Sequence, residues 1–181
     1  MNDKVCSEKH AKRLRKLHAR DPNFGVIGHL WAEKIAMLMR DGQCETILDY
    51  GCGRSDLVPA VVVALHAMNM PCVKRQEYDP ATAPGTPEPA DFVSCIDVLE
   101  HVEVDKLDAV LSHIHKLMRK SGIITVSLRN GSLANRKTHP LVRPREWWIE
   151  KLHERFYVDE ISPLDPAKAK SELAVLVEPI R

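Results

Sequence analysis

The residues best suited to chemistry lie in two short stretches and at one distant histidine. The first stretch, 49–53, is Asp-Tyr-Gly-Cys-Gly, an acid followed by glycines at alternate positions. The second, 97–103, is Asp-Val-Leu-Glu-His-Val-Glu, which places two carboxylates and an imidazole within five residues. His139 follows in an arginine-rich segment. Carboxylates and imidazoles move protons near neutral pH and bind divalent cations, so these residues are the first candidates for a site.

The 49–53 stretch predicts a strand, a tight turn and a helix that together form a cradle for a nucleotide-sized ligand. Gly51 and Gly53 lack Cβ atoms, so the turn can take unusual φ angles and a ligand can approach the backbone. Ser55 or Asp56 then caps a helix whose free N–H groups face the turn. The third glycine of the dinucleotide pattern is missing, and the acid at the strand end would repel phosphate. A cationic, amine-bearing ligand such as S-adenosylmethionine (SAM) suits this loop better.

Both stretches resemble those of the class I SAM-dependent methyltransferases. Residues 49–53 are similar to their Asp/Glu-x-Gly-x-Gly loop, and 97–102 to the Asp-Val-Leu-Glu-His-Val run that follows their fourth strand. The resemblance covers nearly everything from residue 25 onward and implies a methyl-transfer enzyme that uses SAM. The cofactor contacts that we predict on this basis are Asp49, Tyr50, Gly51, Gly53, Asp97 and Leu99. The resemblance also places the helix before the first strand across the cofactor, near His29.

The ribose contact is predicted at the end of the second strand, 72–78, which runs into Asp79-Pro80. In a doubly wound sheet the acid that closes this strand faces the crevice and can accept both ribose hydroxyls. We predict Asp79 in that role. Glu77 is the rival, because the strand end is ambiguous by a residue or two, and a plain turn aspartate before proline is the structural alternative.

His101 is the best candidate for a general base, because its ordinary pKa lies near the working pH and it adjoins the crevice. The structural alternative is that it only caps the next helix. His139 is the second predicted catalytic residue, reaching across from the later segment.

A metal site is the other mechanism that these residues suggest. Asp97-x-x-Glu100-His101 with His139 resembles the Glu-x-x-Glu-His and downstream His of ubiquinone-pathway and small-RNA terminal O-methyltransferases. That resemblance implies Asp97, Glu100, His101 and His139 as ligands of Mg²⁺ or Mn²⁺. Asp97 stands where those families have Glu and is one methylene shorter, which favours the metal-free mechanism.

Alternating helical and strand patterns must position these residues. Helices are predicted at 26–40, 57–68, 104–120 and 144–155, and strands at 46–49, 72–78, 92–96, 123–128, 156–161 and 172–177. The order predicts an α/β fold with a Rossmann-like, doubly wound sheet of the seven-stranded type, its last strand antiparallel. The segment between Asp79 and Asp91 is too short and proline-rich for the usual helix and third strand. The sheet is therefore predicted to be abridged there, and the adenine contact stays unassigned.

The composition of the chain indicates its class, its domain number and its cellular location. The 181 residues carry a formal charge of +1, with 44% hydrophobic and 28% charged residues, as expected of one globular domain. We divide the chain into a basic N-terminal segment, 1–22, and a methyltransferase domain, 23–181. Five scattered cysteines without a Cys-x-x-Cys pair favour reduced thiols and a cytoplasmic location. No membrane-length apolar run or signal peptide is apparent.

The chemical class of the methyl acceptor is inferred only from the charge of the chain. Residues 129–145 carry five Arg or Lys and no acid, and the N-terminus is also basic, which favours an anionic acceptor. We expect O-methylation of an anionic small molecule or of a nucleic-acid hydroxyl. The alternatives are a catalytically silent SAM-binding subunit and, less favoured for want of the third glycine, a nicotinamide-binding protein.

Overall fold

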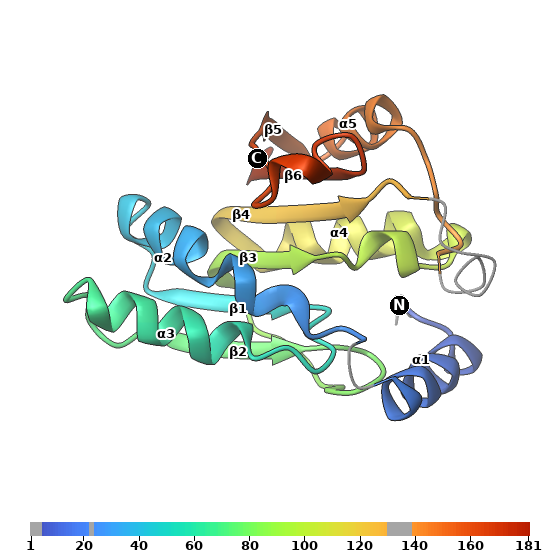
Figure 1. Ribbon diagram of the computed structural model, residues 1–181, viewed down its shortest axis with the longest axis horizontal. Coiled ribbons are helices and arrows are strands. Elements are labelled where there is room, and N and C mark those ends of the chain that lie inside the picture. Colours follow the sequence, from blue (N-terminus) through green and yellow to red (C-terminus); the bar gives the residue numbers. More distant parts are fainter. Residues whose placement is uncertain (1–4, 22–23, 130–138) are drawn as a thin grey trace.

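A six-stranded sheet runs through the centre of the structure, with helices on both faces (Figure 1). The computed structural model describes residues 5–21, 24–129 and 139–181. The strands are β1 (Thr46–Tyr50), β2 (Lys74–Tyr78), β3 (Ala90–Ile96), β4 (Met118–Ser127), β5 (Phe156–Glu160) and β6 (Glu172–Pro179). Their order is β2-β1-β3-β4-β6-β5. Neighbours among β2, β1, β3 and β4 are parallel, whereas β6 is antiparallel to both β4 and β5.

Four of the five helices in the described residues divide between the two faces of the sheet, and the first helix lies beside the carboxyl ends of the strands (Figure 1). The helices are α1 (Glu8–Arg20), α2 (Ala32–Asp41), α3 (Leu57–Ala67), α4 (Leu107–Leu117) and α5 (Arg145–His153), with 3₁₀ turns η1 (Ile27–Trp31), η2 (Leu99–His101), η3 (Val104–Lys106) and η4 (Pro166–Lys168). Successive strand residues point to opposite faces, so Ile47 packs in the core under α2 and α3 while Leu48 packs in the core under α4 and α5. The sheet is thereby buried on both sides, as parallel sheets require.

The predicted abridgement of the sheet is confirmed. The connection 79–89 forms no strand, and only one isolated bridge pairs Asp79 with Ala83. Prolines at 80, 84, 87 and 89 remove backbone donors that a strand ladder would need. As a result β2 lies at the edge of the sheet, with the last strand antiparallel as expected.

One predicted element boundary is wrong. The helix expected over 104–120 ends at Leu117, and the chain enters β4 directly at Met118. Gly122 is therefore no helix cap but a strand residue. A Cβ there would lie 2.4 Å from the carbonyl oxygen of Val93, so glycine lets β4 approach β3 closely.

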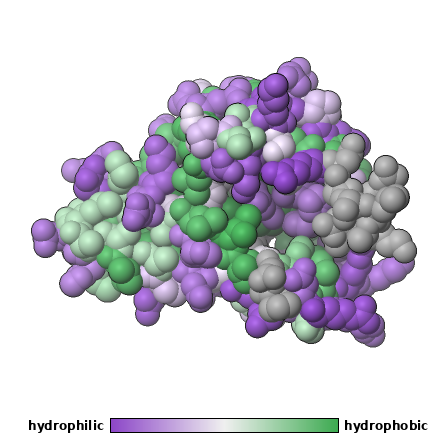
Figure 2. Space-filling view, in the orientation of Figure 1, coloured by the Kyte–Doolittle hydropathy of each residue, from purple (hydrophilic) through white to green (hydrophobic). Residues whose placement is uncertain are grey.

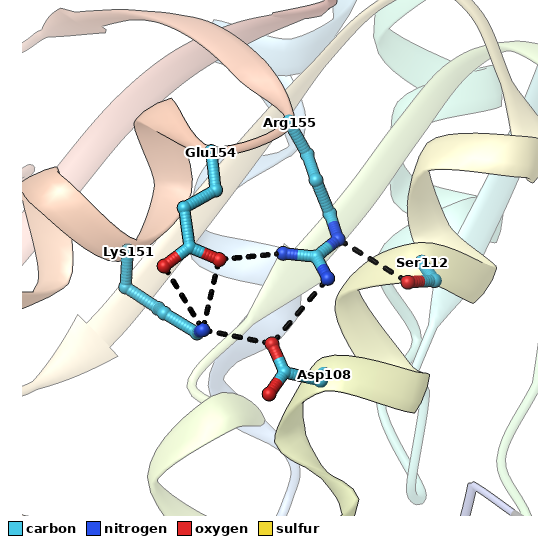
Figure 3. A network of polar contacts seen from close by, with 5 residues as sticks. All are labelled: Asp108, Ser112, Lys151, Glu154 and Arg155. Carbon is cyan, nitrogen blue, oxygen red and sulfur yellow. Dashed lines mark hydrogen bonds and ion pairs between the residues drawn. The ribbon is translucent and has the colours of Figure 1, made fainter.

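A surface network holds α5 to α4 (Figure 3). The carboxylate of Asp108 accepts from Lys151 at 2.7 Å and from Arg155 at 3.3 Å, while Glu154 bonds both cations. Arg155 also donates to the hydroxyl of Ser112 at 3.2 Å. The network fixes the far end of the segment that starts at His139.

All five cysteines are unpaired. Among the described residues, no helix has the length and apolar character needed to cross a membrane.

Candidate active site

A cavity of about 310 Å³ opens at the carboxyl ends of the parallel strands. Its wall includes the glycine loop after β1, Asp79 after β2, residues 96–101 after β3, Ser127 at the end of β4, and His139. Open α/β sheets bind ligands at this edge, because side chains from several strand ends converge there. The two candidate stretches and His139, distant in sequence, thus meet at one cavity.

The glycine loop has the predicted strand–turn–helix form. Gly51 and Gly53 adopt φ angles of +80° and +56°, in the left-handed region that favours glycine. A Cβ on Gly51 would lie 2.4 Å from a methyl group of Val98, so the loop has no room for a side chain there. Beyond the turn the hydroxyl of Ser55 accepts a 3.2 Å hydrogen bond from the N–H of Leu57, the first residue of α3, whose N-cap is Asp56.

Asp49 is buried at the floor of the cavity. Its carboxylate accepts a 2.9 Å hydrogen bond from the hydroxyl of Ser94 on the neighbouring strand. Burial, opposed by that hydrogen bond and reinforced by the charge of Glu77, raises the pKa of Asp49 to about 7. The carboxyl group is therefore poised to ionise when a cationic ligand arrives.

Asp79 lies at the cavity wall, directly after the last residue of β2. One oxygen of its carboxylate accepts from the backbone N–H groups of Ala81 at 2.7 Å and Thr82 at 2.8 Å. These bonds hold one oxygen of the carboxylate in place and leave the other oxygen outside this pair of bonds. Glu77 is exposed and is not among the cavity's wall residues, so the geometry favours Asp79 over its rival.

Tyr50 and Leu99 are not among the residues that line the cavity, so their cofactor contacts stay predictions. Tyr50 is buried on the α4 face, where its hydroxyl lies 3.0 Å from Nδ1 of His113. Leu99 is fully buried in the same core. Asp49 and Tyr50 are consecutive residues of β1, so their side chains point to opposite faces of the sheet. Asp49 reaches the cavity, and Tyr50 therefore enters the core on the other face.

Asp97 stands at the end of β3 with a left-handed φ of +52°. Its carboxylate accepts from the hydroxyl of Thr125 at 2.7 Å, and burial raises its pKa. It lines the cavity as expected of a cofactor contact, which stays a prediction.

Glu100, His101 and His139 form a compact cluster beside the cofactor cradle. One ligand atom from each lies within 4.8 Å of the others. The carboxylate of Glu100 is 1% exposed and accepts from the N–H of Ser127 at 3.1 Å, but its Oε2 has no hydrogen-bond partner among the described residues. Nδ1 of His139 also lacks one. Burial raises the pKa of Glu100 well above its usual range and lowers that of His139.

The structure does not bring Asp97 together with the other predicted metal ligands, so its role as a ligand stays a prediction. Asp97 does not belong to the group of ligand atoms formed by Glu100, His101 and His139. Its left-handed backbone turns the side chain toward β4, where Thr125 takes one oxygen.

The rings of the cluster are held by their neighbours. The ring of His101 packs edge-on against that of His139, with centroids 4.6 Å apart, and against Phe24 at 5.3 Å. The carbonyl of His101 lies 2.9 Å from Nε2 of His10 in α1. The N–H of Leu141 donates to the carbonyl of Glu100 at 3.3 Å and ties the later segment to the cluster.

The N-terminal segment forms a wall that sequence patterns did not assign to the site. Leu14, Leu17 and His18 of α1 line the cavity, and they are followed along the chain by Asp21, Phe24, Gly25, Ile27 and Gly28. Arg54 of the glycine loop donates to the carbonyl of His18 at 2.9 Å and joins the two parts. The sequence distinguished this segment only by its basic charge, and nothing in it singled out His18.

The helix predicted to cross the cofactor begins as the 3₁₀ turn η1. Gly28 lines the cavity, and a Cβ there would lie 2.5 Å from the hydroxyl of Ser55. His29 is instead exposed, with Nδ1 2.7 Å from the carbonyl of Val26. The predicted division at residue 22 stays a prediction, although residues on both sides of it line one cavity.

The charges around the cavity are acidic. Its wall holds the carboxyl groups of Asp21, Asp49, Asp79, Asp97 and Glu100, and among the described wall residues none is Lys or Arg. Arg145, expected to attract an anion, instead bonds Glu160 and the carbonyls of Ala169 and Glu172. Arg143 is exposed and stacks over Trp147, and Arg136 and Lys137 lie outside the described residues. This field favours a cationic ligand in the cavity.

Comparison with known proteins agrees with this geometry. The sequence profile of a family described as a methyltransferase domain matches residues 11–157. No curated protein shows significant sequence similarity to the chain.

Solved structures of methyltransferases share the fold. The 1,6-didemethyltoxoflavin N1-methyltransferase of Burkholderia thailandensis, solved with S-adenosylhomocysteine, is 16% identical with a TM-score of 0.64 over 96% of this chain and 90% of that one. The N-methyltransferase NodS of Bradyrhizobium japonicum is 13% identical with a TM-score of 0.52 over 82% and 94%. The methyltransferase domain of bacterial CtHen1-C is 13% identical with a TM-score of 0.53 over 86% and 100%. At these identities the similarity shows the fold.

Proposed function

The chain belongs to the class I SAM-dependent methyltransferase family, and from that premise we propose that it methylates a hydroxyl group beside Glu100, His101 and His139. The observation that carries this proposal is the convergence of one buried carboxyl and two imidazoles at the edge of the cofactor cradle. Such groups serve oxygen nucleophiles, which must lose a proton to be methylated. A catalytically silent SAM-binding subunit would need no such cluster.

The cradle supplies the contacts that SAM requires. Gly51 and Gly53 let the ligand approach the backbone, and Asp49 can pair with its ammonium group. Asp79 lines the same cavity with a carboxylate held by Ala81 and Thr82, and it would accept the ribose hydroxyls. The acidic wall attracts the positively charged sulfonium of the methyl donor more strongly than the uncharged thioether of the product. This difference assists product release.

We further propose that Glu100, His101 and His139 hold a divalent cation, Mg²⁺ or Mn²⁺. Among the described residues, the buried Oε2 of Glu100 and Nδ1 of His139 have no hydrogen-bond partner, and this fits such a role because orphaned buried polar atoms are costly. The lowered pKa of His139 keeps its imidazole neutral and able to ligate. When bound, the cation would lower the pKa of an acceptor hydroxyl. Because Asp97 lies outside the cluster, these three residues would be the protein ligands, one fewer than the resemblance implies.

The protein's own residues position and protect the reaction. Leu14 and Leu17 cover the cavity and exclude water, while Phe24 and His139 hold the His101 ring. In the metal-free alternative, His101 takes the hydroxyl proton as general base.

An acceptor can reach the cavity along an adjoining groove, the acceptor groove, formed by Ile27, Leu30, Trp31, Leu164, Asp165, Lys168 and Glu172. Ile27 lines both spaces. Ser127 of the cavity is also paired across the sheet with Glu172 of the groove. Leu30 and Leu164 are exposed here, and a green area lies over η1 in Figure 2. The groove favours an acceptor with an apolar body. An anionic group on the methyl acceptor stays a prediction. The same holds for a nucleic acid as acceptor and for a cytoplasmic location.

The test is methyl transfer from labelled SAM to pools of hydroxyl-bearing metabolites and RNA, with and without chelator. We expect activity to vanish in excess chelator, to return with Mg²⁺ or Mn²⁺, and to vanish in Glu100→Gln while SAM affinity is retained. Activity that survives chelation but not His101→Ala would support the metal-free base. Activity that persists in both would overturn the role of the cluster.

A further inference from the structure

The surface helix α3 and the segment that follows it carry no charged side chain. Residues 57–73 contain no Asp, Glu, Lys or Arg. Val63 is nonetheless 71% exposed, and Pro59 and Ala67 are exposed beside it. Figure 2 shows this apolar surface as the green area at the end of the molecule that α3 occupies. A helix that is apolar all round is normally buried, so this face is suited to an interface.

A groove runs between α3 and the segment that leads into β2. We call it the α3 groove; it has a volume of about 270 Å³ and is lined by Val62, Val63, Leu65, His66, Met70, Pro71, Cys72 and Val73. None of these residues lines the cofactor cavity. The groove lies at the amino end of β2, whereas the cavity lies at the carboxyl ends of the strands.

The edge of β2 beside this groove is open. The N–H of Lys74 donates to Glu45, and the carbonyl of Tyr78 accepts from Gly51, so these residues direct their backbone groups toward β1. Alternation along the strand then directs the backbone groups of Arg75 and Glu77 outward. Among the described residues those groups have no hydrogen-bond partner. The open stretch ends at Asp79, whose N–H and carbonyl pair with Ala83.

This open edge is complementary to itself. If a second copy pairs antiparallel about a twofold axis at Gln76, Arg75 lies opposite Glu77 of the second copy, and Glu77 opposite its Arg75. Both are hydrogen-bonded pairs, because both residues direct N–H and C=O groups outward. Each also places an arginine beside a glutamate, and opposite charges directly across strands are stabilising. A charged edge normally prevents pairing, but this order of charges favours it.

The same axis brings the apolar surfaces together. α3 packs over β1 and β2 on one face of the sheet. Since paired strands lie about 4.8 Å apart, two such helices flanking the axis would lie roughly 10 Å apart, close to the spacing of packed helices. Val63 and the α3 groove would then be covered by α3 of the second copy. The open edge is short, so apolar burial must supply most of the affinity.

We propose that a second copy of this chain docks on α3 and the β2 edge, giving a twofold dimer with one sheet continuous through both copies. The interface lies away from both cofactor cavities. Neither copy contributes to the other's chemistry, so this inference does not depend on the proposed function.

Charge reversal tests the register. Sedimentation equilibrium should show a concentration-dependent dimer for the natural protein. Arg75→Glu places like charges opposite each other, as does Glu77→Arg, and each should weaken association more than about tenfold. The double variant Arg75→Glu/Glu77→Arg restores opposite charges and should dimerise again. Val63→Glu should weaken association through the apolar contact, and unchanged SAM binding verifies that each variant is folded.

Three results would overturn the proposal or its register. A natural protein that stays monomeric at the highest soluble concentration excludes a second copy as the occupant of this surface. A dimer whose affinity is the same in all four variants uses another surface. Loss in both single variants without recovery in the double variant would reject the antiparallel register about Gln76.

Discussion

At the scale of single residues, the site depends on carboxyl groups whose burial changes their protonation. Asp49 and Glu100 are both buried at the cavity, and burial is the main cause of the raised pKa of each. A buried carboxyl without a partner is stabilised in its neutral form, so a cation that binds beside it must displace a proton. Cofactor and metal binding should therefore depend on pH.

Asp49 gives the first prediction. Its pKa of about 7 in the folded apo protein means that it is largely protonated at pH 6. Binding of the SAM ammonium group should ionise it and release close to one proton, and affinity should rise from pH 5 to pH 7. Calorimetry in buffers of different protonation enthalpy measures this release. Asp49→Asn should abolish it.

The same group affects stability. The folded pKa of Asp49 exceeds its unfolded value of 3.8. Its contribution is thus fully present below pH 4 and is lost as the pH rises toward 7. Urea unfolding of the apo protein and of Asp49→Asn measures this change. From pH 4 to pH 7 the free energy of unfolding of the natural protein should fall relative to that of the variant. A difference independent of pH would contradict the raised pKa.

Asp79 and Glu77 are a matched pair for the ribose contact. Asp79→Ala should weaken SAM binding by about 1.5–3 kcal/mol, the range for hydrogen bonds to a charged group. Glu77→Ala should leave the affinity unchanged, because Glu77 lies outside the cavity wall. The reverse outcome would assign the ribose contact to Glu77. Asp79→Asn keeps an acceptor for Ala81 and Thr82 and separates loop distortion from ligand contact.

At the scale of elements, the glycine loop is held by its neighbour after β3. Gly51 has a φ of +80° and faces the methyl groups of Val98. A side chain at 51 therefore meets both backbone strain and a clash before any ligand is present. A binding defect in a Gly51 variant cannot be separated from a folding defect unless stability is measured.

Gly51→Ala should destabilise the protein by more than the roughly 1–2 kcal/mol expected from left-handed strain alone. In the Val98→Ala background the two methyl groups closest to the new Cβ are absent. Gly51→Ala should therefore lower the free energy of unfolding less in that background than in the natural protein. Urea unfolding of the four proteins forms a double-mutant cycle. Additive effects would show that the clash does not form.

At the scale of the whole molecule, chemistry and association occupy different parts of the sheet. The carboxyl ends of the strands form the cavity, while β2 and α3 form the proposed dimer surface. Loss of the third strand connects these facts, because it makes β2 an edge strand.

Association should appear in thermal unfolding. Because a dimer is stabilised by mass action, the melting temperature of the natural protein should rise with protein concentration. Arg75→Glu should melt at a temperature independent of concentration, and the charge-swapped double variant should behave like the natural protein. SAM should raise the midpoint in all three, since the cavity is distant from the interface.

The sequence determined the order of elements, the glycine turn and the abridged sheet, because these depend on local chemistry. Alternating apolar residues, paired glycines and clustered prolines each restrict the backbone in their own neighbourhood. It also identified Asp49, Asp79, Glu100, His101 and His139, whose positions at predicted strand ends or in the later segment placed them near one edge.

Only the tertiary structure decided which side chains share the cavity. Strand alternation and the left-handed turn at Asp97 direct Tyr50 into the core and Asp97 toward Thr125. The packing of α1 brings Leu17 and His18 over the site from a segment with no local signal of that role. Such contacts join residues far apart in the chain, so their geometry depends on how whole elements pack rather than on any local pattern.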